Sequence, residues 1–131
     1  MKTTPKRLIK EIMTNQVITI DADMTADEAL ILLHELKINA APVIDTAGKV
    51  FGVLSCKDIT KLHLARENMN ANHAWEICTP MVITVSPASP VRDAVDQMIK
   101  NSVHHIIVTE GDKLKGIVSS LDILNSLDES F

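Results

Sequence analysis

The sequence has few aromatic residues. Of its 131 residues, two are phenylalanine, one is tryptophan and none is tyrosine. The core must therefore be built from aliphatic side chains and methionine. Proteins that bind single-stranded nucleic acid stack the bases on aromatic rings, so the composition argues against that class. The net charge is −4, and no basic patch stands out that would attract a polyanion. We therefore expect no nucleic-acid partner.

Long apolar runs and paired cysteines are also missing. No apolar run approaches the length of a membrane span, and the start, MKTTPKRLIKEIM, lacks the apolar segment of a signal peptide. Cys56 and Cys78 form no CxxC pair. We expect two reduced thiols in a cytoplasmic protein with no membrane partner. Hydrophobic residues make up 46% of the chain and charged residues 23%, which is typical of one globular domain.

The chain does contain an internal repeat. GVLSCKD at 52–58 and GIVSSLD at 116–122 share a glycine, two apolar residues, a serine and an aspartate in the same order. Upstream of them, VITIDADMTADEALILLHELKINAAPVID aligns with VITVSPASPVRDAVDQMIKNSVHHIIVTE. The sequence therefore predicts a unit that has been duplicated within one domain.

Each copy predicts the order β-α-β-β-α, and the fold class is α/β, strictly α+β. Thr25 with Glu28 predicts one helix start, as a capping box. Ser89 as N-cap and Pro90 as the first helical residue predict the other. A unit of about 50 residues is too small to be stable alone. The expected strands are 17–20, 40–45 and 49–55, then 82–85, 104–109 and 113–119, with closing helices over 57–67 and 121–127.

The repeated serine and aspartate have two interpretations. S-x-x-D is close to a capping box, in which both side chains satisfy backbone donors at a helix start. The same residues also suit a ligand, because a carboxylate accepts two hydrogen bonds and a helix N-terminus favours an anion. A duplication would copy a cap as readily as a binding site. The residues alone leave both interpretations open.

The motifs resemble those of the CBS domain, a family named after cystathionine β-synthase. Three pairs carry the resemblance: IMTNQVITI with ICTPMVITV, KINAAPVID with SVHHIIVTE, and GVLSCKDI with GIVSSLDI. The resemblance implies a first motif at 8–62, a connecting helix or linker at 63–76 and a second motif at 77–127. Together they would form one CBS pair, or Bateman module, over 1–131. No catalytic domain is left over, so we expect a stand-alone CBS-pair protein.

The resemblance also implies a fold and a function. The two repeats would pack sheet to sheet with pseudo-two-fold symmetry and leave two related clefts. Such modules bind AMP, ADP, ATP or S-adenosylmethionine as a regulatory ligand, require no cofactor and often form homodimers. They report to a protein partner that this sequence does not identify. The alternative is a structural or dimerisation domain whose clefts bind nothing.

Site residues follow from the same resemblance. Asp58 and Asp122 would bind ribose, and phosphate would contact Ser55, Ser119, Lys57 or His105. By similarity to the γ subunit of AMP-activated protein kinase, each cleft would combine both repeats. One adenine pocket would combine Ile18, Ile38 and Ala40 with Ile117, beside Ser119 and Asp122. The other would combine Ile83 and Val103 with Val53, beside His105, Ser55 and Asp58.

Two further classes are less well supported by the residues. An enzyme using Cys56 or His105 would need a nucleophile–base contact that the sequence does not identify, so we expect no catalytic activity. His104 and His105 are adjacent in a predicted strand and would point to opposite faces. They are therefore a poor chelating pair, and we expect no metal site.

Overall fold

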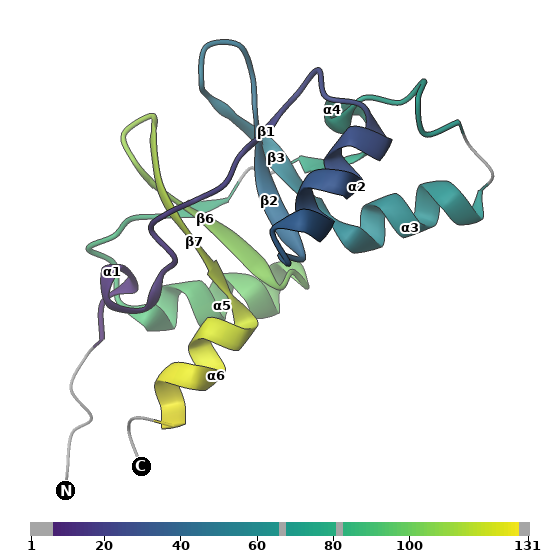
Figure 1. The fold of residues 1–131 in the computed structure, drawn as a ribbon. Coiled ribbons are helices and arrows are strands. Elements are labelled where there is room, and N and C mark those ends of the chain that lie inside the picture. Colours follow the sequence, from purple (N-terminus) through teal and green to yellow (C-terminus); the bar gives the residue numbers. More distant parts are fainter. Residues whose placement is uncertain (1–6, 66–67, 81–82, 129–131) are drawn as a thin grey trace, which may run out of the picture. The chain divides into compact units, whose positions relative to one another are not determined.

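The computed structural model describes residues 7–65, 68–80 and 83–128 (Figure 1). The chain forms two compact units. We call Ile18–Val82 the central unit, and Met1–Val17 together with Ile83–Phe131 the terminal unit. Within the described part, no helix has both the length and the apolar character needed to cross a membrane. The start of the predicted strand at Val82 and residues 66 and 67 of the predicted linker lie outside the described residues.

The central unit has a four-stranded sheet in the order β1-β2-β3-β4. The strands are β1 (Ile20–Asp21), β2 (Ala40–Ile44), β3 (Val50–Ser55) and β4 (Thr79–Pro80). β1 runs parallel to β2, whereas the other pairs are antiparallel. The helices are α2 (Ala26–Glu35), α3 (Cys56–Leu64) and α4 (Ala74–Ile77). The core is aliphatic, as the composition requires: Ile20, Ala29, Leu33, Ala41, Val43, Leu54, Ile59, Ala74 and Cys78.

The terminal unit repeats this plan with a three-stranded sheet in the order β5-β6-β7. Its strands are β5 (Thr84–Val85), β6 (His105–Glu110) and β7 (Lys113–Ser119), and its helices are α1 (Ile9–Ile12), α5 (Val91–Asn101) and α6 (Ser120–Asp128). β5 is parallel to β6, and β6 is antiparallel to β7. The predicted β-α-β-β-α order of each copy is therefore confirmed.

Local signals predicted one long helix start correctly and placed the other one residue early. The backbone N–H of Thr25 donates to Glu28 Oε1 at 3.2 Å, which completes the predicted capping box of α2. The N-cap of α5 is Pro90 instead of Ser89, so the prediction was wrong by one residue. The cause is tertiary: Leu8 pairs with Pro90 in an antiparallel bridge, and the carbonyl of Ser89 accepts from the N–H of Ile9 at 2.8 Å, so Pro90 stays in an extended conformation.

The segment that leads into each repeat belongs to the other repeat's compact unit. Thr14 exchanges two backbone hydrogen bonds with Ile117 of β7, at 3.0 and 3.1 Å. The corresponding segment of the second repeat forms α4 and β4, and β4 pairs with β3 of the central unit. The compact units are therefore not the two sequence repeats, because each takes its lead-in segment from the other one.

These crossing segments explain the repeated glycine of the GVLSCKD and GIVSSLD stretches. A Cβ at Gly116 would lie 2.7 Å from the carbonyl oxygen of Thr14 and 2.7 Å from Met13 Sδ. A Cβ at Gly52 would collide with the carbonyl oxygen of Thr79. Glycine is required at both positions because another backbone passes directly over the strand.

We expect Gly116→Ala to destabilise the fold by about 1–3 kcal/mol, since the methyl group has no space beneath the Thr14 carbonyl. Urea unfolding measures the loss. Lys115→Ala changes the neighbouring exposed residue and should stay within about 0.5 kcal/mol of wild type. Equal unfolding midpoints for Gly116→Ala and Lys115→Ala would show that the lead-in segment does not press on β7.

Candidate functional site

The first candidate site lies where β3 ends and α3 begins. Ser55 is the N-cap of α3. Its hydroxyl accepts from the N–H of Asp58 at 3.3 Å, and its own N–H donates to Asp58 Oδ2 at 2.9 Å. The hydroxyl also donates to the same Oδ2 at 3.0 Å. The pair therefore forms a reciprocal capping box.

The second candidate site has the same geometry between β7 and α6. The N–H of Ser119 donates to Asp122 Oδ2 at 2.8 Å, and the N–H of Asp122 donates to Ser119 Oγ at 3.0 Å. The capping interpretation of the S-x-x-D motif is therefore confirmed in both copies. In each copy the aspartate accepts the capping hydrogen bonds through Oδ2, and its other carboxylate oxygen, Oδ1, accepts none of them. Capping and ligand binding are therefore compatible roles for one aspartate.

Strand pairing brings further predicted site residues beside each helix start. Ala40 is the register partner of Ser55, and His105 is the register partner of Ser119. Directly paired residues of antiparallel strands point to the same face of the sheet. Within each unit, the structure therefore groups the serine, the aspartate and one residue of the preceding strand.

The remaining predicted residues occupy several environments. Val53 lies two residues before Ser55, and Ile117 two before Ser119, so each shares its serine's sheet face. Ile38 and Val103 pack against the cores of their own units. Ile18 is 42% exposed. Lys57 is exposed in the first turn of α3, and Ile83 is half-buried just before β5.

The predicted clefts combine residues of the central unit with residues of the terminal unit. Ile18, Ile38 and Ala40 belong to the central unit, whereas Ile117, Ser119 and Asp122 belong to the terminal unit. The second cleft divides in the same way, with Val53, Ser55 and Asp58 in the central unit and Ile83, Val103 and His105 in the terminal unit. The assembly of each cleft from these halves stays a prediction.

Two side chains beside the candidate sites have shifted protonation equilibria. Burial lowers the pKa of His105, the neighbouring His104 lowers it further, and the carboxylate of Asp122 raises it. The imidazole is therefore mainly neutral at pH 7 and would contact a phosphate chiefly by a hydrogen bond instead of an ion pair. Burial raises the pKa of the Cys78 thiol to about 11, and the charge of Asp58 adds to the rise.

The cysteine prediction agrees with the structure. Cys56 and Cys78 are both unpaired. Because of its raised pKa, the Cys78 thiol is protonated at neutral pH and is a poor nucleophile. Cys56 Sγ lies 4.0 Å from the carbonyl oxygen of Ile38. Among the described residues, no three His, Cys, Asp or Glu side chains gather in a way that could hold a metal ion.

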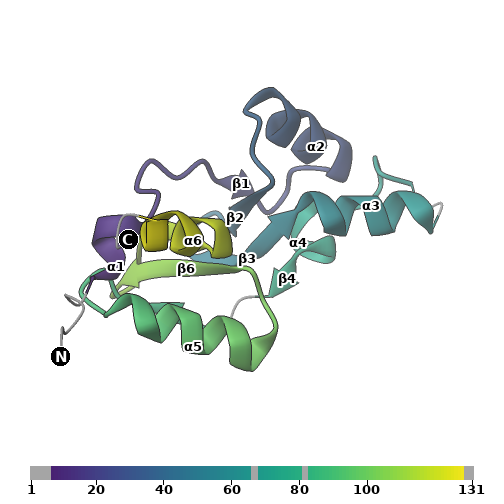
Figure 2. The same ribbon diagram turned by 90° about the horizontal axis from the view of Figure 1, so that it is seen from below.

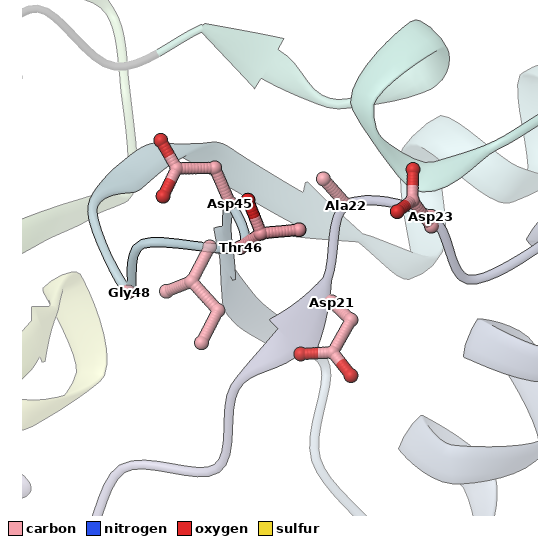
Figure 3. Close-up of a pocket in the computed structure, with 7 residues that line it drawn as sticks. Asp21, Ala22, Asp23, Asp45, Thr46 and Gly48 are labelled. Carbon is pink, nitrogen blue, oxygen red and sulfur yellow. The ribbon is translucent and has the colours of Figure 1, made fainter.

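The sequence did not reveal a cavity of about 570 Å³ at the far end of β2 from Ala40 (Figure 3). In Figure 3 the carboxylates of Asp21, Asp23 and Asp45 point in different directions. Asp45 Oδ1 accepts the N–H groups of Ala47 and Lys49, at 2.9 Å each, and thereby stabilises the β2–β3 turn. The presence of Asp45 in the cavity lining is therefore explained by its role in the turn. The lining residues are Asp21, Ala22, Asp23, Ile44, Asp45, Thr46 and Gly48.

A smaller cavity, of about 180 Å³, lies beside Asp122 in the terminal unit. Arg7, Glu11 and Ile12 line it from the N-terminal segment, and Asp122, Asn125 and Ser126 line it from α6. The two groups are more than a hundred positions apart in the chain, so sequence spacing gave no signal for the cavity.

Comparison with known proteins identifies the repeated unit. The CBS domain model matches residues 9–65 and 74–129. The chain is 28% identical over 123 residues to a homoserine O-acetyltransferase of Methanohalobium evestigatum, covering 92% of this chain and 24% of that protein. It is 32% identical over 121 residues to an L-aspartate semialdehyde sulfurtransferase of Methanocaldococcus jannaschii, covering 92% and 23%. The chain thus spans about a quarter of the length of these relatives.

A solved structure is similar over the whole fold. It is the CBS domain pair of protein MJ0100 in complex with 5′-methylthioadenosine and S-adenosyl-L-methionine. The TM-score is 0.87 at 28% identity, and the match covers 97% of this chain and 100% of that one. Two family matches in one chain, together with a repeated α+β fold, lead to one conclusion: the chain belongs to the CBS domain family and carries the domain twice, as a CBS domain pair.

Proposed function

We propose that this CBS domain pair binds an adenosine compound and passes the binding event to a protein partner. CBS domain pairs are regulatory modules, generally without catalytic activity of their own. The observation that carries the proposal is the geometry of Asp58 and Asp122. Each accepts the capping hydrogen bond through Oδ2, which leaves Oδ1 outside the cap. The complex of a 28% identical domain pair with 5′-methylthioadenosine and S-adenosylmethionine supports the same ligand class.

In this proposal each aspartate binds the ribose. A ribose offers two neighbouring hydroxyl donors, and a carboxylate oxygen outside the cap is a strong, charged acceptor for them. The apolar residues Ile18, Ile38, Ala40 and Ile117 would enclose the adenine at one site, with Ile83, Val103 and Val53 at the other. Each cleft would then require both units, so that ligand binding would change how they pack.

The candidate sites offer few groups that could bind the phosphate of a nucleotide. The hydroxyl of Ser55 already donates to Asp58 Oδ2 and accepts from the Asp58 N–H, and the hydroxyl of Ser119 accepts from the Asp122 N–H. His105 is mainly neutral at pH 7, which leaves Lys57 as the charged phosphate contact. We therefore propose AMP or a phosphate-free adenosine compound in preference to ATP. A cytoplasmic location remains a prediction, supported by the two free cysteines.

Asparagine substitutions separate the cap from the ligand contact. In Asp58→Asn and Asp122→Asn the amide oxygen can still accept the capping hydrogen bond. The amide nitrogen takes the place of the second carboxylate oxygen and cannot accept a hydrogen bond from the ribose. We expect stability within about 1 kcal/mol of wild type, because only a first-turn charge is lost. For wild type, ligand at about 100 times its Kd should add roughly 2.7 kcal/mol. One asparagine variant should abolish that gain, which thermal unfolding with AMP, ADP, ATP, S-adenosylmethionine and 5′-methylthioadenosine measures.

Asp58→Ala and Asp122→Ala serve as the matched pair that loses cap and contact together. They should be less stable than the asparagine variants even without ligand, by about 0.5–2 kcal/mol for the lost cap. If no adenosine compound raises the wild-type midpoint, the repeated motif is a helix cap alone. The protein would then be a ligand-free interaction domain.

We also propose that the chain forms a homodimer through α6. Leu121, Leu124 and Leu127 are 61%, 58% and 47% exposed. The repeat aligns them with polar residues of α3, namely Lys57, Thr60 and His63. The fold therefore does not require leucine at these places. The three leucines are evenly spaced about Leu124, so an antiparallel second copy of α6 would match them in register.

We expect wild type to sediment as a dimer and Leu124→Lys to sediment as a monomer, because a buried unpaired charge would replace the central apolar contact. Thr60→Lys places the same charge at the corresponding position of α3 and should leave the dimer intact. Analytical ultracentrifugation over a range of concentrations distinguishes the two results. A wild-type chain that stays monomeric throughout would contradict the dimer.

A further inference from the structure

The cavity beside Asp122 combines three charged side chains that are distant in sequence. Arg7 and Glu11 come from the N-terminal segment, and Asp122 comes from the first turn of α6. Figure 2 shows α1 beside α6, in agreement with the residues that share the cavity. The remaining lining residues are Ile12, Asn125 and Ser126. Asp122 therefore faces a second group of polar side chains in addition to its own cap.

The N-terminal segment is held in place on the terminal unit. Ile9 is fully buried in the core of that unit. Its N–H donates to the carbonyl of Ser89 at 2.8 Å, and the N–H of Lys10 donates to the carbonyl of Pro87 at 3.0 Å. Glu11 and Ile12 follow directly in α1. The cavity wall that carries Glu11 is therefore a fixed part of the unit.

The size of the cavity limits what it can hold. Pockets for whole drug-sized ligands usually measure about 300–1,000 Å³, whereas this one measures about 180 Å³. It has room for a group of several non-hydrogen atoms next to the ribose that Asp122 would bind, but not for a complete adenosine compound.

The charges in the cavity favour a group that carries both signs. A phosphate would be attracted by the guanidinium of Arg7 but repelled by the carboxylates of Glu11 and Asp122. The α-carboxylate of an amino acid matches the planar donor fork of an arginine. Its α-ammonium matches a carboxylate. An amino-acid group therefore satisfies both kinds of side chain, as a phosphate does not.

The other repeat differs at the corresponding positions. There the sequence has Asn72 in place of Arg7 and Leu62 in place of Ser126. Leu62 is buried. Glu76 is the counterpart of Glu11, and its Oε1 lies 2.9 Å from Nδ1 of His73. Ser126 is buried too, but it is a smaller side chain than leucine. The repeat thus shows that the fold accepts leucine where the terminal unit has serine.

We propose that this cavity binds the amino-acid group of S-adenosylmethionine, with Arg7 and Glu11 as the residues that determine specificity. The inference rests on the proposed function, since Asp122 would hold the ribose of the same molecule. It assigns S-adenosylmethionine to the Asp122 site, and it gives the N-terminal segment a role in choosing the ligand.

Isothermal titration calorimetry tests the proposal. S-adenosylmethionine and 5′-methylthioadenosine share the thioadenosine part, but the former carries both the amino-acid group and a sulfonium charge. S-adenosylhomocysteine, which has the amino-acid group on a neutral thioether, is therefore titrated beside them and should show the same preference over 5′-methylthioadenosine. Wild type should bind S-adenosylmethionine at least about tenfold more tightly than 5′-methylthioadenosine, which corresponds to about 1.4 kcal/mol. Glu11→Gln, Arg7→Gln and Ser126→Leu should each remove most of that preference. Their affinity for 5′-methylthioadenosine should stay unchanged, which also shows that the variants fold.

Lys10→Gln is the control, because Lys10 lies on α1 beside Glu11 and outside the cavity lining. It should keep the wild-type preference. Equal binding of S-adenosylmethionine and 5′-methylthioadenosine by wild type, or variants that leave the preference unchanged, would overturn the inference and leave the proposed function standing. If neither ligand nor AMP binds, the proposed function fails as well. If Ser126→Leu does not fold, Glu11→Gln decides the question.

Discussion

The fold depends on one close contact, made twice: a lead-in segment crosses the last long strand of a repeat, β3 or β7, directly over a glycine. Thr14 lies over Gly116 in the terminal unit, and Thr79 lies over Gly52 in the central unit. The crossing segment adds to the sheet in the central unit and bridges to β7 in the terminal unit. It also carries a short helix, and α1 thereby brings Glu11 beside α6. The contact that ties the repeats together therefore also supplies one wall of the small cavity.

In the proposed function, the aspartate of each S-x-x-D motif has a structural role and a binding role. The cap of each closing helix ends on one carboxylate oxygen, so the aspartate is held in a fixed orientation before any ligand arrives. A ligand contact built on such a side chain loses little conformational entropy on binding. For this reason the presence of a cap does not argue against a ligand site.

The helix caps of the candidate site were predictable because they are local: the capping residues lie within one helical turn. Strand pairing places Ala40 beside Ser55 and His105 beside Ser119, whereas the predicted clefts group each of these residues with the serine of the other repeat. Other features were not predictable, because they arise where distant segments meet. The shift of the α5 N-cap to Pro90 depends on pairing with Leu8, and the lowered pKa of His105 depends on burial and on His104. No periodicity in the sequence reports such contacts.

The sequence by itself determined the duplication, the order of elements in each copy, the aliphatic core and the capping boxes of α2, α3 and α6. All of these follow from residue type and short-range spacing. Tertiary structure decided which lead-in segment joins which sheet, why glycine precedes each last-strand serine, and which charged groups share a cavity with Asp122. The physical reason is that these features depend on which distant segments occupy neighbouring space. Close packing fixes those neighbours only when the whole chain has folded.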